Sequence, residues 1–63
     1  MLVKFVRMDG TNIGINPDNV EAVSLPVQQD QNQGAKSAVH VVSGKVFSMK
    51  TPFDDAIKLI NKM

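Results

Sequence analysis

The sequence predicts a mainly β domain of the α+β class, an antiparallel meander of four to five strands with one amphipathic C-terminal helix. Two observations predict it. Short β-branched runs alternate with Gly, Pro, Asn and Asp turns, and the C-terminal segment carries apolar residues at helical spacing. Within a single domain, 1–63, the predicted elements are strands at 2–8, 11–15, 20–25, 37–42 and 45–49, a mobile Gln-rich loop at 26–36 and a helix at 52–62.

The first three strands are separated by turn signals. Asp9-Gly10 predicts a two-residue type I′ hairpin turn, which requires positive φ at both central residues. Gly14, inside the second strand, indicates a bulge, a bend or the close approach of another group. Segment 16–19 predicts a tight corner, because Pro17 fixes φ and its Asn and Asp neighbours bond local amides. Pro26 ends the third strand or restricts it to the edge of the sheet.

Ser43-Gly44 predicts a second hairpin with a two-residue loop. The predicted register pairs Val42 with Lys45, Val41 with Val46 and His40 with Phe47. One face of this hairpin then carries Val39, Val41 and Val46, and the other carries Ala38, His40, Val42, Phe47 and Met49. Neither face is plainly polar, and one helix covers only one of them. We therefore expect either a sheet curled into a small barrel or, as the favoured alternative, burial of the second face or an edge against another copy.

The C-terminal helix has a clear start. Thr51 is expected to be the N-cap and Pro52 the first helical residue, with Asp54 and Asp55 in the first turn, where they complement the helix dipole. Lysines near the other end complement the opposite pole. The residues of the apolar stripe are Phe53, Ala56, Ile57, Leu59, Ile60 and Met63.

Composition excludes several classes of function. The chain has 63 residues, 7 basic against 6 acidic side chains, a net charge of +1, no cysteine and one histidine. A disulfide and a cysteine nucleophile are therefore excluded, and the usual zinc ligand sets cannot be assembled. No apolar run is long enough for a membrane span or a secretory signal, so we expect a cytoplasmic location and no membrane partner. So small a core needs added stabilisation, which makes the chain itself the expected partner.

No set of residues supports catalysis, so we expect no enzyme activity, catalytic residue, metal or cofactor. A serine triad needs His40 as its base, and adjacent Asp54 and Asp55 point about 100° apart on a helix. Arg7, Lys36, Lys45 and Lys50 form a scattered basic surface. The candidate ligand-binding residues are three of these cations together with the histidine: Arg7, His40, Lys45 and Lys50. Nucleic acid is disfavoured as a partner because the aromatic platform is missing.

A family resemblance covers most of the chain. It rests on Asp9-Gly10-Thr11, on residues 13–23 around Asn16-Pro17-Asp18, on residues 39–47 and on Thr51-Pro52-Phe53-Asp54-Asp55-Ala56-Ile57. This order resembles the small FlbD/SwrD-like family of flagellar and swarming accessory proteins, and the Gln-rich stretch 28–33 departs from it. A similar layout occurs in phage anti-Thoeris proteins that sequester cyclic nucleotide immune signals as oligomers. No binding residue carries over from either group.

These observations lead to one hypothesis and two alternatives. The first is a non-catalytic homo-oligomeric binding or accessory module that acts through a sheet edge or a subunit interface, on its own copies or on a protein partner. The second is a phage-type protein that sequesters a nucleotide signal at a subunit interface. The third is a weak nucleic-acid-binding protein.

Overall fold

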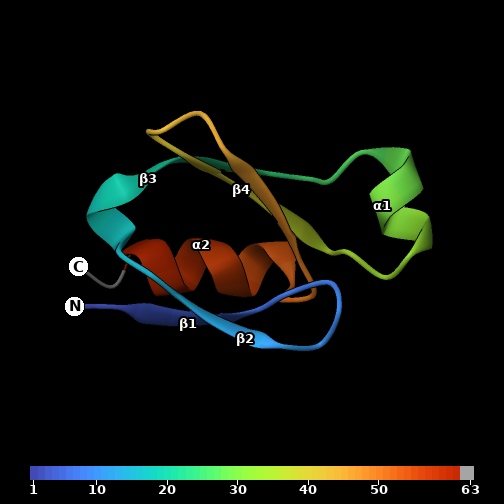
Figure 1. Ribbon diagram of the computed structural model, residues 1–63, viewed down its shortest axis with the longest axis horizontal. Coiled ribbons are helices and arrows are strands. Elements are labelled where there is room, and N and C mark those ends of the chain that lie inside the picture. Colours follow the sequence, from blue (N-terminus) through green and yellow to red (C-terminus); the bar gives the residue numbers. More distant parts are fainter. Residues whose placement is uncertain (62–63) are drawn as a thin grey trace.

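Two antiparallel sheets and two helices make up the part of the chain that the computed structural model describes, residues 1–61 (Figure 1). In chain order the elements are β1 (Val3–Val6), β2 (Asn12–Ile15), the 3-10 turn η1 (Pro17–Asn19), β3 (Val20–Ser24), α1 (Gln28–Asn32), β4 (Ser37–Val41), β5 (Val46–Met49) and α2 (Phe53–Asn61). β1 pairs with β2, and β3, β4 and β5 form a three-stranded sheet in that order. The α+β class with a C-terminal helix is confirmed. The predicted helix end at residue 62 and the stripe residue Met63 lie outside the described residues.

The two sheets meet at one end only. Arg7 forms an antiparallel bridge with Met49, and the Lys50 N–H donates to the Val6 carbonyl over 2.7 Å. Elsewhere in residues 1–61 no strand pairing joins the sheets, so the alternative of a closed barrel is wrong. The helix α2 lies between β1–β2 and the larger sheet instead, and it packs against β1, β3 and β4 (Figure 1). Helix packing therefore replaces strand pairing on this side of the core.

A single hydrophobic core draws on both sheets and on α2. Its fully enclosed members are Phe5, Ile15, Val39, Met49 and Ala56. Partly buried residues surround them: Val3, Ile13, Val20, Val23, Val41, Phe47, Leu59 and Ile60. A β-bulge between Val20 and Ala22 allows Val20 and Val23 to reach the same face of β3, although they are three positions apart in the chain.

Both hairpin turns differ from the prediction in the same way. The Gly10 N–H donates to the Arg7 carbonyl and the Gly44 N–H to the Val41 carbonyl, and both glycines have positive φ, 90° and 94°. No other residue type between 1 and 61 has positive φ, which excludes a type I′ turn at Asp9. Each loop is a three-residue turn with glycine at its last position. The loops therefore take residues from the predicted strands, which are shorter than expected.

The longer loop shifts the second hairpin by one residue. His40 pairs with Val46 and Val39 with Phe47, so the predicted pairs of His40 with Phe47, Val41 with Val46 and Val42 with Lys45 are wrong. A one-residue shift turns the side chains of one strand to the opposite face relative to its partner, here those of β5 relative to β4. Val39, Val41, Phe47 and Met49 now share the core face. The outer face of these two strands carries Ala38, His40, Val46 and Ser48, so the predicted assignment of residues to the two faces is wrong as well.

A short helix, α1, stands where a loop was predicted for 26–36. Its polar side chains bond locally: Gln31 Nε2 donates to the Pro26 carbonyl and Gln28 Nε2 to Asn32 Oδ1. The Asp30 carboxylate accepts a bond from the Ser48 hydroxyl over 2.6 Å, which fixes α1 to the outer side of β5. α1 itself has no apolar or buried residue, so hydrogen bonds and not packing hold it in place. The predicted mobility of this segment stays a prediction.

The C-terminal helix begins one residue later than expected. The Ala56 N–H donates to the Pro52 carbonyl, which gives Pro52 the backbone position of an N-cap. The Thr51 hydroxyl accepts the Val6 N–H over 3.0 Å, so its predicted role as the N-cap is wrong. The Thr51 carbonyl accepts a bond from the buried Ser37 hydroxyl over 2.7 Å. Thr51 thus ties β1 and β4 to the start of α2.

Candidate functional site

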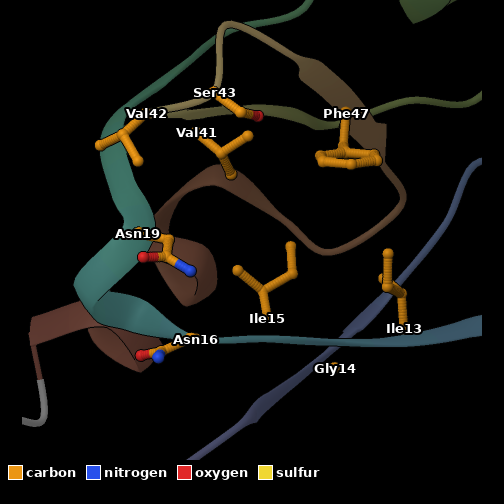
Figure 2. Close-up of a pocket in the computed structure, with 9 residues that line it drawn as sticks. All are labelled: Ile13, Gly14, Ile15, Asn16, Asn19, Val41, Val42, Ser43 and Phe47. Atoms are coloured by element: carbon orange, nitrogen blue, oxygen red, sulfur yellow. The ribbon is translucent and has the colours of Figure 1, made fainter.

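An apolar groove opens between β2 and the β4–β5 hairpin, on a part of the core that α2 leaves uncovered. Its volume is about 300 Å³. In Figure 2, Phe47 and Val41 point down from the hairpin toward Ile15 and Ile13, which rise from β2. The full lining is Ile13, Gly14, Ile15, Asn16, Asn19, Val41, Val42, Ser43 and Phe47. No member of this lining is charged, in a chain with 21% charged residues.

The polar residues of the groove lie at its rim. Asn16 is held by local bonds, because its Oδ1 accepts the Asp18 N–H and its carbonyl accepts the Asn19 N–H. The Asn19 carbonyl accepts the Val42 N–H over 2.9 Å, which joins η1 to the hairpin tip. Val42 itself is 65% exposed at this rim. The groove therefore has an apolar floor, a fixed polar corner and a protruding apolar side chain.

The edge of β2 beside the groove is unpaired in the described chain. Val6 lies opposite Asn12 but does not hydrogen-bond to it. The Val6 N–H donates to the Thr51 hydroxyl, and the Val6 carbonyl accepts the Lys50 N–H. The backbone groups of Asn12 therefore point away from β1, and those of Gly14, two residues on, do the same. Both residues are exposed. They present free N–H and C=O groups along one side of the groove.

Another side chain approaches Gly14 closely, which was one of the three predicted explanations for a glycine inside this strand. A β-carbon at Gly14 would lie 3.2 Å from Leu2 Cδ1, and the register of β1 and β2 shows no bulge there. Leu2 is 69% exposed over this glycine, on the side of β2 away from the groove. Apolar groups therefore flank both faces of β2 near its free edge.

The four predicted ligand-binding residues do not come together. Arg7 and Lys50 lie on neighbouring backbones where the sheets meet, whereas Lys45 lies at the opposite end of β5. Lys36, which the sequence placed on the basic surface, joins the first two, because its N–H donates to the Met49 carbonyl. Arg7, Lys36 and Lys50, all exposed, form what we call the basic corner. None of these residues lines the groove.

His40 lies on the outer face of the larger sheet. It is half-buried, and its Nε2 lies 2.9 Å from the Ser24 hydroxyl. A serine–histidine pair resembles part of a catalytic triad, which needs a carboxylate on the other ring nitrogen. Asp30, the carboxylate fixed to this side of the sheet, bonds Ser48 instead. The pair is explained by cross-strand hydrogen bonding.

Asp9 shows the clearest electrostatic effect among the described residues. The Thr11 hydroxyl and the Thr11 N–H both donate to its carboxylate, and these bonds lower the pKa of Asp9, with a further contribution from Arg7. The Asp9 side chain is exposed at the first turn and stabilises that turn. Its charge therefore offsets part of the positive charge of the basic corner.

Residues 1–61 contain neither a candidate metal site nor a candidate membrane-spanning helix. No group of three His, Cys, Asp or Glu side chains in this range is arranged to hold a metal ion. No helix in the same range is long and apolar enough to cross a membrane.

Sequence reasoning missed the residues that form the groove. Phe47 was assigned to the wrong face because of the register, and Ile13 and Val41 carry no chemical signal of their own. One signal was present. β2 has no lysine, proline or bulge of the kind that usually protects an edge strand.

Comparison with protein-family models, curated proteins and solved structures finds no match to this chain. The resemblance to the FlbD/SwrD-like and anti-Thoeris groups therefore stays a prediction.

Proposed function

We propose that this chain is a non-catalytic binding module that works as a homo-oligomer and joins its copies through the free edge of β2 and the adjoining groove. The observation that carries this proposal is the uncharged groove beside an unprotected strand edge. Exposed edges and apolar grooves of this kind are the surfaces at which proteins add a partner strand. The outer face of the larger sheet, which carries Ala38, His40, Val46 and Ser48, plays no part in it.

The size of the domain supports the same proposal. A chain of 63 residues without disulfides has a small core, and association adds stability that the core alone does not provide. The groove exposes part of that core, because Phe47 and Ile13 are only half-buried. Covering the groove therefore removes apolar surface from water.

Sedimentation equilibrium tests self-association. We expect the average mass to rise above that of the 6.9 kDa chain as the concentration is raised over about a hundredfold range. Val42→Lys places a charge at the groove rim and is expected to raise the dissociation constant about tenfold or more. The matched control is Val46→Lys on the outer face, which should leave it unchanged. A monomer at every concentration contradicts the proposal.

The basic corner favours a second candidate function, the binding of a phosphate-bearing small molecule such as a nucleotide signal. Its three cations approach from different segments, since Arg7 follows β1, Lys36 precedes β4 and Lys50 follows β5. Three cationic residues whose backbones meet at one sheet junction are suited to phosphate oxygens. This candidate needs no self-association, so the two functions are tested separately.

A thermal-shift series with inorganic phosphate, mononucleotides and cyclic dinucleotides tests this candidate. A ligand that binds only the folded state raises the melting temperature, by an amount that grows with its concentration. We expect the shift to be lost in the double variant Arg7→Ala, Lys50→Ala and kept in Lys45→Ala, at the far end of β5. No shift with any compound, or an equal shift in all variants, contradicts phosphate binding at the basic corner.

A further inference from the structure

We propose that β2 pairs antiparallel with β2 of a second copy across a two-fold axis at Ile13, and that this pairing joins the two grooves. The inference rests on the proposed self-association and names its surface and register. In this arrangement Asn12 lies opposite Gly14 of the partner subunit, and Ile13 lies opposite Ile13 of the partner subunit.

The backbone supports this register. The outward groups of β2 belong to Asn12 and Gly14, one residue to each side of Ile13. In an antiparallel pair centred on Ile13, Asn12 lies opposite Gly14 of the partner subunit, and Gly14 lies opposite Asn12 of the partner subunit. Each Asn12–Gly14 pair then exchanges N–H···O bonds in both directions, as hydrogen-bonded antiparallel pairs do. The free backbone groups of the edge are all satisfied.

Neighbouring registers conflict with bonds that the chain already makes. A two-fold axis at Gly14 sets Asn12 against Asn16, whose carbonyl already accepts the Asn19 N–H. An axis at Asn12 sets Gly14 against Gly10, whose N–H is bonded to Arg7 and whose φ is 90°. Centring on Ile13 uses only free groups.

Charge identifies the occupant as a second copy. Across a two-fold axis a strand faces a second copy of itself, so a strand of one charge sign would be repelled by its partner. The groove lining contains no charged residue, and neither does β2. Edge strands that must stay single usually carry a lysine, a proline or a bulge, and β2 has none of these. β2 can therefore pair with β2 of a second copy without charge repulsion, and it has no feature that prevents this pairing.

The apolar groups around β2 add contact area on both faces. Leu2 lies over Gly14 on one face. On the other face Val41 and Phe47 lie above Ile15 and Ile13, and Val42 lies beside Asn19 (Figure 2). Pairing extends the β1–β2 sheet into the partner and brings these side chains near the junction. Leu2 and Val42, both more than half exposed in the isolated chain, then become partly covered.

Disulfide cross-linking tests the register directly, because the chain has no cysteine of its own. Ile13→Cys places two sulfurs in a directly opposed pair and is expected to form a covalent dimer under mild oxidation. Val46→Cys, exposed on the outer face of β5, is the control and should stay monomeric on a denaturing gel.

A proline substitution gives a second test that does not alter the groove. The N–H of Asn12 is not used on β1, so Asn12→Pro keeps the β1–β2 ladder and removes a donor only from the outer edge. Circular dichroism is expected to match that of the unaltered chain. The dissociation constant of the dimer is expected to rise about tenfold to a hundredfold, because one bond is lost on each side of the axis.

Hydrogen exchange in the unaltered chain completes the test. The amides of Asn12 and Gly14 should exchange more slowly as the concentration is raised. A chain that dimerises by sedimentation, without cross-linking at Ile13, without an effect of Asn12→Pro and without protection at these amides, overturns the register and leaves self-association standing. A monomer at every concentration overturns both.

Discussion

Replacing Phe5 with alanine is expected to unfold the protein at room temperature. Phe5 is completely buried at the centre of the core, where β1 meets the larger sheet and α2. Truncating a buried phenylalanine costs about 3–5 kcal/mol. A core of this size supplies about 3–5 kcal/mol of stability in total, so little or none remains.

The spectra of Phe5→Ala are expected to lack the dispersed amide signals of a folded domain and a cooperative thermal transition. The control is Val46→Ala, since Val46 is exposed and its truncation should change the free energy of unfolding by no more than about 0.5 kcal/mol. A folded Phe5→Ala protein with a normal melting curve would show that the core is not centred on Phe5.

Thr51→Val is expected to lower the free energy of unfolding by about 1–3 kcal/mol. Valine keeps the shape of threonine and loses the hydroxyl that accepts the Val6 N–H. That N–H is half-buried at the junction of the sheets and has no other acceptor among the described residues. An unpaired buried donor is the physical cause of the loss.

Thr51→Ser is the matched control, because it keeps the hydroxyl and removes only the methyl group. Urea unfolding followed by circular dichroism should give a midpoint for Thr51→Ser close to that of the unaltered chain and a clearly lower one for Thr51→Val. Equal losses in the two variants would assign the role of Thr51 to methyl packing and not to its hydrogen bond.

Local patterns were sufficient to predict where most elements lie. The spacing of Ala56, Leu59 and Ile60 predicted α2, and the β-branched runs around Val3, Val20 and Val39 predicted their strands. The turns at Asp9-Gly10 and Ser43-Gly44 were placed correctly, but their length was not. A glycine after a polar residue suits two-residue and three-residue loops alike. The difference of one residue in loop length changes the register, and the register determines which face Phe47 occupies.

The remaining errors concern features that arise from contacts between distant segments. α1 depends on the bond from Ser48 to Asp30, 18 residues apart, which no local pattern contains. The groove depends on how the β1–β2 hairpin sits against the β4–β5 hairpin. The basic corner depends on Met49, which brings Lys36 and Arg7 to the same place. Charge alone selected Arg7, Lys45 and Lys50 alike, and it carried no information on the distance of Lys45 from the other two.

The bond between Val6 and Thr51 spans 45 residues, and it has a consequence for folding during synthesis. While the ribosome still holds the segment around Thr51, the first hairpin has neither this acceptor nor the helix that covers its apolar side. Two strands without a covering layer are marginal in water. The first hairpin is therefore expected to stay open until Thr51 and α2 have emerged, and the domain is then expected to acquire its structure in one step.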